Sequence, residues 1–353
     1  MDKRTIEIYE AGAVTYRDRP RSGAPPVQVV RLIERAGDGL RLDLGSGPGV
    51  WTTAFGEPVV ALDAAHAMVA LAPATSLRVQ ADIEALPLRR GCIAATLASK
   101  SMQHVPAERL PLALADLHRA MALGAPLELV VFRGSAGTWC SQGDDLPGRM
   151  FWQWEATDLE AVVRGAGFDP VEIGVRERND ADELHVSATR ARMLPDLVRP
   201  GLRVLFCGFN PSLYAADTGV AFGRPGNRFW PAAIESGLLT RDRDPWHAVR
   251  HDGVGWTDLV KRATVAASEL TTDELRDGFA RVERLCEWLQ PGVVCLLGLG
   301  GWRAIVDRKA TAGFQERTMG GRPVYVMPNP SGLNASTQHG GFVEHLTRVS
   351  GSA

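Results

Sequence analysis

Residues 203–212 read Arg-Val-Leu-Phe-Cys-Gly-Phe-Asn-Pro-Ser, and this stretch decides the fold of the second half of the chain. An aliphatic and β-branched run that ends in a polar turn is typical of a buried parallel strand. Residues 323–331 follow a similar pattern, Pro-Val-Tyr-Val-Met-Pro-Asn-Pro-Ser. Ligands bind at the carboxyl edge of an open α/β sheet, where such strands end. We therefore expect both Asn-Pro-Ser turns to contribute to one site.

Strand-like runs alternate with helical patterns along the whole chain, which predicts doubly wound α/β domains. The expected strands of the first half are 40–44, 59–62, 93–98, 127–132, 170–176 and 183–188, with helices at 109–123 and 156–165. The second half has expected strands at 203–207, 293–297 and 323–327. The segment 193–200 contains two prolines and mixed charges and marks a boundary. We predict two three-layer α/β domains, residues 1–194 and 199–353.

The composition is that of a soluble globular protein, with 45% apolar and 23% charged residues among 353. From residue 196 onward the chain carries 18 basic and 16 acidic residues, so this half has a charge of +2 within a total of −2. This agrees with DNA binding by the second half without requiring it. The five cysteines form no Cys-x-x-Cys pair, so we expect no metal site. No signal peptide or membrane span is apparent, which predicts a cytoplasmic location, or a nucleoid-associated one in a prokaryote.

The first half has a glycine-rich turn directly after its first expected strand. Residues 42–49 read Leu-Asp-Leu-Gly-Ser-Gly-Pro-Gly, and glycines let the backbone turn tightly and approach a ligand. Asp63 ends the next strand, 20 residues after Asp43, where a carboxylate can take both ribose hydroxyls. Asp82 follows a third expected strand end, near an adenine edge. These residues together predict a nucleoside-binding site.

The turn and the two later carboxylates resemble the class I methyltransferases that use S-adenosylmethionine, over residues 35–190. A dinucleotide-dependent reductase is the alternative, although the turn lacks the wider Gly-x-Gly-x-x-Gly spacing. The resemblance implies that S-adenosylmethionine is the cofactor and implies these contacts: Asp43, Gly45, Gly47 and Gly49 at the methionine end, Asp63 at the ribose and Asp82 at the adenine.

The methyl acceptor is expected to be a small molecule. No Pro-Cys pair provides a nucleophile for cytosine C5 methylation, since Gly91 precedes Cys92 and Trp139 precedes Cys140. The fourth strand also lacks an Asn/Asp-Pro-Pro-aromatic turn. His104 is either a base near the transferred methyl group or, as is more usual, a capping or core histidine.

The second half combines the two Asn-Pro-Ser turns with aromatic residues between glycines and prolines, in 218–222 and in Pro-Gly-Asn-Arg-Phe-Trp at 225–230. An apolar residue, Leu333, stands in a polar loop, as base-stack wedges do. These stretches, with 255–264, resemble the mismatch-specific uracil and thymine DNA glycosylases over residues 199–350. The partner that this implies is double-stranded DNA with a mispaired or damaged base.

The resemblance implies a role for each matching position. Asn210 orients the water that attacks the sugar, and Phe222 stacks on the extruded base. Asn329 and Ser331 flank the base pocket and the abasic sugar, while Gly332 and Leu333 fill the hole left in the duplex. Two positions depart from the family pattern: Ser212 replaces a glycine, and Ala215 stands where some members have serine. Both departures concern the pocket and its choice of base.

The expected function is therefore a DNA repair glycosylase that releases uracil, or thymine or a damaged pyrimidine, from G·U and G·T mispairs, fused to a methyltransferase of unknown acceptor. In the alternative, the methyltransferase is the working enzyme and the second half is a weakly active module that targets DNA. A third interpretation takes residues 210–213 as a displaced amino-methyltransferase turn. Leu213 offers no ring for stacking there, which disfavours it.

Overall fold

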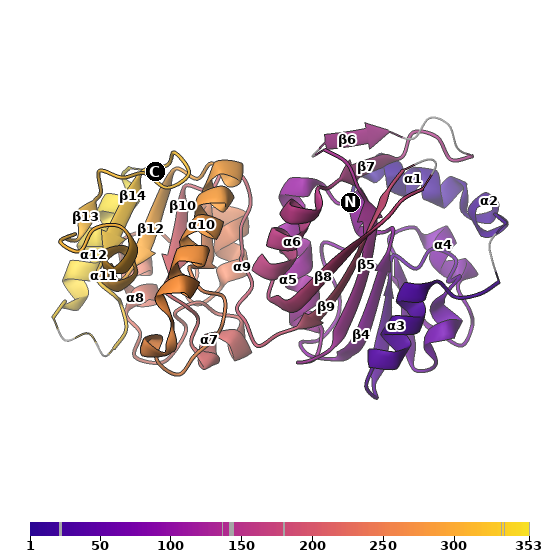
Figure 1. The fold of residues 1–353 in the computed structure, drawn as a ribbon, viewed down its shortest axis with the longest axis horizontal. Helices are drawn as coiled ribbons and strands as arrows, with labels where there is room; N and C mark the ends of the chain where they lie inside the picture. The colour runs from indigo at the N-terminus through magenta and orange to yellow at the C-terminus, as the bar shows by residue number, and fades with distance from the viewer. Residues whose placement is uncertain are drawn as a thin grey trace. The chain divides into compact units, whose positions relative to one another are not determined.

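A computed structural model of the chain describes residues 1–20, 23–135, 137–140, 145–178, 181–332, 334 and 336–352. The chain divides into two compact units. The first comprises Met1–Arg164 and Phe168–Ala191, and the second comprises Gly165–Gly167 and Arg192–Ala353. Figure 1 shows a separate sheet with flanking helices in each unit. The expected pair of α/β folds is thus confirmed.

The first unit is built on a seven-stranded sheet with the order β3-β2-β1-β4-β5-β9-β8. Its strands are β1 (Leu40–Leu44), β2 (Val59–Asp63), β3 (Leu77–Gln80), β4 (Ile93–Ser99), β5 (Pro126–Phe132), β8 (Phe168–Arg176) and β9 (Glu183–Arg190), with a hairpin of β6 (Gly137–Cys140) and β7 (Met150–Gln153). The helices are α1 (Lys3–Ala11), α2 (Ala13–Arg17), α3 (Val27–Arg35), α4 (His66–Leu71), α5 (Leu110–Ala120) and α6 (Ala156–Gly165). Strands β1 to β5 pair in parallel, and β9 pairs antiparallel with both β5 and β8.

The second unit has a five-stranded sheet with the order β11-β10-β12-β14-β13. Its strands are β10 (Val204–Gly208), β11 (Val254–Asp258), β12 (Val293–Leu297), β13 (Gly313–Phe314) and β14 (Val324–Met327). Its helices are α7 (Leu213–Thr218), α8 (Phe229–Glu235), α9 (Pro245–His247), α10 (Thr272–Leu289), α11 (Leu299–Ile305) and α12 (His339–Ser350). All strands but the edge strand β13 run parallel.

Each sheet changes its direction of growth beside its first strand. From β1 the chain builds outward through β2 and β3 and then continues on the other side with β4 and β5. From β10 it places β11 on one side and β12 and β14 on the other. Because the crossovers of parallel strands are right-handed, the reversal sends helices to opposite faces and leaves a crevice at the strand ends. The crevices lie between β1 and β4 and between β10 and β12.

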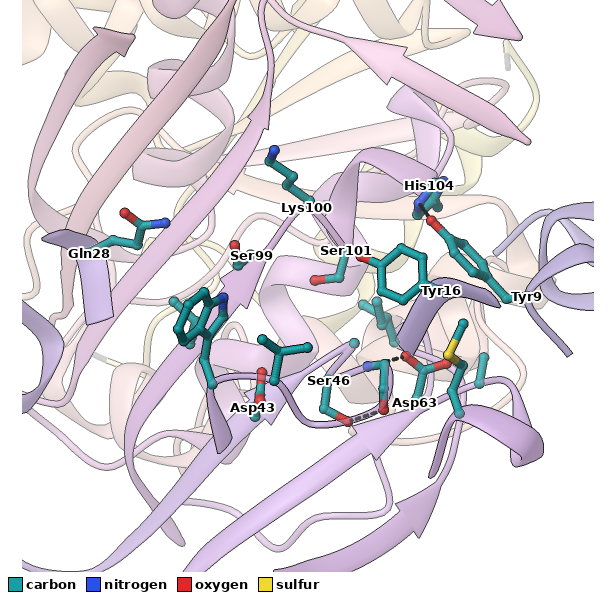
Figure 2. A pocket seen from close by; sticks show the side chains of 18 of the residues that line it. Tyr9, Tyr16, Gln28, Asp43, Ser46, Asp63, Ser99, Lys100, Ser101 and His104 are labelled. Atoms are coloured by element: carbon teal, nitrogen blue, oxygen red, sulfur yellow. Dashed lines mark hydrogen bonds between the residues drawn. The ribbon is translucent and has the colours of Figure 1, made fainter. Parts of the chain in front are cut away.

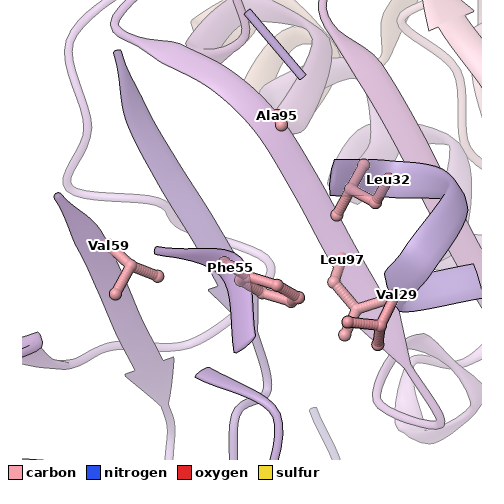
Figure 3. Close-up of a cluster of buried hydrophobic side chains, with 6 residues drawn as sticks. All are labelled: Val29, Leu32, Phe55, Val59, Ala95 and Leu97. Carbon is pink, nitrogen blue, oxygen red and sulfur yellow. The ribbon is translucent and has the colours of Figure 1, made fainter. Parts of the chain in front are cut away.

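A buried apolar cluster supports the first of these crevices (Figure 3). Its six side chains come from α3, from the short helix Thr52–Phe55 and from two strands: Val29, Leu32, Phe55, Val59, Ala95 and Leu97. Full burial of a large aliphatic or aromatic side chain contributes about 1.5–3 kcal/mol. Leu97 also lines the cavity described below, so this packing fixes one wall of a site.

A buried cluster of charges holds the end of β11 in the second unit. The Asp196 carboxylate accepts hydrogen bonds from Lys261 Nζ (2.6 Å), Thr257 Oγ1 (2.8 Å) and Arg281 Nη1 (2.7 Å). Arg281 also donates to the carbonyl oxygen of Asp258 (2.6 Å). Burial alone would raise the pKa of Asp196, but the charges of Arg281 and Lys261 lower it. The cluster therefore fixes the strand end that carries Asp258.

Replacing Asp196 with alanine leaves Lys261 and Arg281 buried without their counter-charge. We expect Asp196→Ala to lower the free energy of unfolding of the second unit by roughly 3–5 kcal/mol. Hydrogen exchange of β10 and β12 peptides along a urea gradient measures this in the full chain. The control is Asp273→Ala, whose side chain is 85% exposed in a pair with Arg276 and which should cost less than about 1 kcal/mol. Equal losses in both variants would contradict the assignment.

Candidate functional site

A cavity of about 440 Å³ lies beside the carboxyl ends of β1, β2 and β4 in the first unit. In Figure 2, Asp43, Ser46 and Asp63 lie at one side of it, and Tyr9, Tyr16 and His104 lie at another. The tyrosines come from α1 and α2, which sequence reasoning did not place at the site. Hydrophobic contacts among Tyr9, Tyr16 and Met68 pack these helices on α4. The cavity therefore has a wall that the strand-end motifs do not provide.

Two glycines of the glycine-rich turn line the cavity, and the third permits close packing of the backbone. Gly45 and Gly47 line the cavity with φ angles of 69° and 54°, in the left-handed region. A Cβ on Gly45 would lie 2.2 Å from that of Ser101, so no side chain fits there. Gly49 lies outside the cavity lining, and a Cβ on it would lie 2.4 Å from Pro73 Cδ. Its glycine permits close packing instead.

Two of the three expected carboxylates line this cavity. Asp63 accepts hydrogen bonds from the backbone N–H of Gly47 and of Ala65, both at 2.9 Å, one on each oxygen. The carboxylate has about four lone-pair sites, so it keeps acceptor capacity for a ligand hydroxyl. Asp43 accepts a hydrogen bond from Thr52 Oγ1 (2.6 Å), and burial raises the pKa of Asp43 to about 7. Burial raises the pKa of Asp63 as well.

The third carboxylate, Asp82, has a different environment from the one expected. It is not among the residues that line the cavity, although its neighbour Ile83 is. Asp82 Oδ2 lies 3.0 Å from the amino group of Met1, which also contacts Glu84. Met1 itself lines the cavity. In this structure, therefore, Asp82 holds the amino-terminal segment at the cavity edge.

His104 belongs to a hydrogen-bond chain with defined proton positions. Its Nδ1 lies 2.7 Å from the carbonyl oxygen of Met150, so Nδ1 carries the proton. Its Nε2 then accepts from Tyr9 Oη at 3.0 Å, and Arg149 donates to the same oxygen at 2.7 Å. Burial lowers the pKa of His104 to about 4, so the ring is neutral at pH 7. His104 is thus a buried histidine with both nitrogens bound, and it also lines the cavity.

In the second unit, side chains gather at the ends of β10 and β11, and we call Gly208, Asn210, Phe222, Asp258 and Thr264 the strand-end cluster. Asn210 Nδ2 donates to the carbonyl oxygen of Arg262 (3.1 Å) and to Thr264 Oγ1 (2.8 Å). The Thr264 hydroxyl donates its only hydrogen to the carbonyl oxygen of Ala266 (2.9 Å), so it must accept a hydrogen bond from Asn210. These partners fix the orientation of the amide. Its carbonyl oxygen is left available as an acceptor.

Phe222 and Asp258 approach the same side of Gly208. A Cβ on Gly208 would lie 2.2 Å from Asp258 Oδ1 and 3.3 Å from Phe222 Cζ. The missing side chain therefore makes room for both. Phe222 has a φ of 55°, a conformation that costs an aromatic residue energy and that clusters at functional sites. Its ring also packs on Phe229, with centroids 5.1 Å apart.

Asp258 is a site residue that sequence reasoning missed. It is 4% exposed, and burial raises its pKa to about 6 despite the nearby cation Lys261. The signal was present, because residues 254–258 form a short apolar run that ends in a carboxylate. That run is β11, in register with β10 so that Asp258 pairs with Gly208.

Arg228 holds the second Asn-Pro-Ser loop in place, a role that its motif did not reveal. Its guanidinium donates to the carbonyl oxygens of Ser331 (2.9 Å) and Thr337 (2.6 Å) and to that of Asn334. Its backbone N–H donates to the carbonyl of Pro330 (3.0 Å). A planar guanidinium presents five N–H donors in a fixed fork and can span several acceptors in this way. Residue 228 thus connects the start of α8 with the loop.

The remaining predicted residues are distributed over both loops. Ser212 caps α7, its Oγ accepting from the N–H of Ala215 (3.2 Å), and Ala215 is buried in that helix. Asn329 Oδ1 accepts from the N–H of Ser331 (3.0 Å). Gly332 lies against the carbonyl of Gly226, 2.9 Å from a Cβ placed on it. Leu333, the expected wedge, lies outside the described residues.

The described residues contain no group of three or more His, Cys, Asp or Glu side chains that could hold a metal ion. Cys92, Cys207, Cys286 and Cys295 are free thiols. Within the described ranges, no helix has the length and apolar character needed to cross a membrane.

Comparison with solved structures finds similar chains among methyltransferases. One is a complex of DhpI with SAH, at 24% identity, covering 53% of this chain and 95% of that one with a TM-score of 0.41. A second is the 1,6-didemethyltoxoflavin-N1-methyltransferase of Burkholderia thailandensis, at 18% identity, 53% and 85% coverage and a TM-score of 0.41. A third is a SAM-dependent methyltransferase from Aquifex aeolicus, at 18% identity, 52% and 98% coverage and a TM-score of 0.40.

Comparison with family models finds one match in each half of the chain. The model described as a methyltransferase domain matches residues 42–124, which include the glycine-rich turn and Asp63. The model described as the uracil DNA glycosylase superfamily matches residues 195–348, which include the strand-end cluster. The chain therefore joins a methyltransferase domain to a domain of the uracil DNA glycosylase superfamily.

Proposed function

We propose that the second unit is a DNA glycosylase that releases uracil, and also thymine or a damaged pyrimidine, from G·U and G·T mispairs in double-stranded DNA. The observation that carries the proposal is the fixed amide of Asn210. Its nitrogen is bound to a backbone carbonyl and to Thr264, so its oxygen is available to accept a hydrogen bond from water. Asn210 follows β10 at the reversal of strand order, where ligands bind in open α/β sheets.

The surroundings of Asn210 suit a base that has left the duplex. Phe222 offers an aromatic ring beside Gly208, and flipped bases stack on such rings. Arg228 holds the loop from Asn329 to Asn334, the segment assigned to the sugar and the duplex. Extrusion costs a few kcal/mol and least at a mispair, so weak pairing itself selects G·U and G·T.

The chemistry of the cluster predicts slow turnover. An amide cannot remove a proton from water as a carboxylate can, so Asn210 contributes by positioning. The base leaves with a negative charge, which must be stabilised by the site. Bases that leave easily as anions should therefore be preferred. The charge of Asp258 should affect this step, because its Oδ1 and the ring of Phe222 approach the same side of Gly208.

The test of the proposal is uracil release from a G·U duplex in single-turnover conditions. We expect Asn210→Ala to slow release by about 100-fold or more, since loss of one oriented polar group costs about 10²–10³ in rate. Binding to the duplex should persist, because the substitution leaves the remaining contacts intact. Melting curves of both proteins serve as the control for folding.

Asn210→Asp is the matched variant, because it keeps the shape and removes the N–H donations to the Arg262 carbonyl and to Thr264. We expect this variant to be slow as well. Release as fast as in the wild type would show that a fixed amide is not required. Tight duplex binding without release by any variant or the wild type would favour the alternative, a DNA-targeting module.

The pKa of Asp258, about 6, predicts a pH dependence of this reaction. Above pH 6 the carboxylate is ionised and opposes the negative charge of the leaving base. The charges that surround it are Lys261 and Arg281, which favour ionisation, and Asp196, which opposes it. We expect the single-turnover rate to fall as the pH rises from 5 to 8 and expect Asp258→Asn to remove this fall. If the rate of Asp258→Asn falls with pH as the wild-type rate does, Asp258 is not the cause.

We also propose that the first unit binds S-adenosylmethionine and transfers its methyl group to a small molecule. The residues present fit this cofactor: Gly45 and Gly47 present bare backbone at the cavity edge, and Asp63 presents acceptor oxygens to the same cavity. When bound, the cofactor supplies an electrophilic methyl group. Asp63 would hold the ribose, while Asp43 and the turn would contact the methionine end. Tyr9 of α1 and Tyr16 of α2 would form a further wall beside the bound cofactor.

The proposed contact between Asp63 and the ribose can be tested by substitution. An asparagine there keeps one acceptor oxygen and presents an NH₂ group to one of the two backbone N–H groups. We expect Asp63→Asn to weaken binding of S-adenosylhomocysteine at least tenfold by isothermal titration calorimetry. Asp18→Asn, at an exposed carboxylate paired with Arg17, is the control and should bind as the wild type does. Unchanged affinity in Asp63→Asn would contradict the ribose assignment.

A further inference from the structure

The cavity of the first unit has a basic wall that the cofactor assignments do not use. Lys100 follows β4, and Arg176 and Arg178 end and follow β8; all three line the cavity. In Figure 2, Lys100, Ser99 and Gln28 lie away from Asp43, Ser46 and Asp63. The wall contains one carboxylate, Glu183, against these three cations. It therefore carries an excess of positive charge.

Lys100 is held in position at some cost in backbone energy. Its φ is 59°, a left-handed conformation that L-residues rarely adopt and that clusters at functional sites. Its Nζ lies 2.6 Å from Glu183 Oε1, and Glu183 is 2% exposed. Burial would raise the pKa of Glu183, but hydrogen bonds from His185 and Lys100 lower it to about 2. An ammonium has three N–H donors, so this contact leaves two for a ligand.

Arg176 adds a cation that is open to a ligand. Within the described part of the chain, no acidic side chain pairs with Arg176, and its side chain is exposed. It lines the first cavity and also a second one, of about 740 Å³, that is lined by Arg31, Glu128 and His185. Gln28 and Pro26 belong to both linings as well. Arg176 thus stands where the two cavities adjoin.

Gln28 supplies an independent sign of a missing ligand. It is 6% exposed, and its Oε1 is buried without a hydrogen-bond partner. A buried polar atom left unpaired costs about 1–3 kcal/mol, so such atoms are rare and call for an explanation. Gln28 lies in the first turn of α3 and lines both cavities. A ligand that offers an O–H or N–H group there would satisfy it.

We propose that the methyl acceptor is a small oxyanion that also carries a hydroxyl or amino group, bound by Lys100 and Arg176 through its anionic group and by Gln28 Oε1 through its hydroxyl or amino hydrogen. The class includes small hydroxy acids, amino acids and organic phosphates. Charge-assisted hydrogen bonds to the basic wall supply most of the affinity. Glu183 orients Lys100 from behind rather than contacting the acceptor. This inference rests on the proposed methyltransferase function of the same cavity.

The test uses the full chain saturated with S-adenosylhomocysteine and four probes, acetate, glycolate, chloride and inorganic phosphate, at constant ionic strength. Acetate and phosphate distinguish a carboxylate from a phosphate site, and glycolate adds a hydroxyl to acetate. We expect saturable binding of at least one oxyanion by isothermal titration calorimetry, and none of chloride. Arg176→Gln and Lys100→Met should each weaken it at least tenfold. Arg164→Gln, on α6 and outside both cavities, is the matched control and should bind as the wild type does.

The contact between Gln28 and the hydroxyl group of the acceptor is tested by comparing glycolate with acetate. Glycolate should bind more tightly than acetate to the wild type, and Gln28→Leu should abolish that difference while acetate binding stays unchanged. Equal affinity for the two acids in the wild type would remove Gln28 from the site. Oxyanion binding that survives both Arg176→Gln and Lys100→Met would overturn the proposal. Failure of the wild type to bind S-adenosylhomocysteine, with oxyanion binding intact, would instead reject the cofactor assignment.

Discussion

The reversal of strand order beside the first strand of each sheet is the constraint on which both sites depend. It leaves β1 next to β4 and β10 next to β12, with the intervening crossovers on opposite faces. The crossover helices then lie on the two faces of the sheet, away from the carboxyl ends of the two central strands. The turns that follow those strands, at 45–49 and 209–212, lie at the resulting crevices. Their chemistry differs, but their position follows from the same rule of chain topology.

Each site also contains a residue in a strained backbone conformation, which its surroundings hold in place. Lys100 and Phe222 are two of the four described non-glycine residues with positive φ. Lys100 lines the first cavity, and Phe222 lies beside Gly208 in the strand-end cluster. In each case a neighbour explains how the conformation persists. Glu183 binds the Lys100 ammonium, and the ring of Phe222 packs on Phe229 in the core. Strain at these two positions therefore accompanies the placement of a side chain rather than the formation of the fold.

The sequence predicted the fold well because buried parallel strands have short apolar runs that are bounded by polar turns. The ranges 40–44 and 293–297 match β1 and β12 residue for residue. The strand β11 was missed, because Val-Gly-Trp-Thr-Asp contains a glycine and a threonine and was noted only for its family resemblance. That omission also hid Asp258. The helices α1 and α2 were missed as well, since nothing local shows that Tyr9 and Tyr16 reach a distant cavity.

Site residues that act through long-range contacts were the least predictable. Asn210 was found from its own turn, but Thr264 and the carbonyl of Arg262, which orient its amide, are more than fifty residues away. Arg228 was visible in the Asn-Arg-Phe-Trp motif, yet its contacts with Ser331 and Thr337 appear only when the loop is in place. A motif identifies a residue type and a strand end. It does not identify the partners that fix a side chain.

Burial of Asp43 lowers the stability of the first unit at neutral pH. Asp43 has a pKa of about 7 in the folded chain and 3.8 as its ordinary value, because burial disfavours its charge. A carboxyl with a raised folded pKa contributes stability that is fully present below pH 4 and is lost as the pH rises through 7. A shift of this size corresponds to about 4 kcal/mol. A ligand that donates hydrogen bonds or brings positive charge to Asp43 would recover part of it. Cofactor binding and the stability of the first unit should therefore be coupled more strongly at pH 8 than at pH 5.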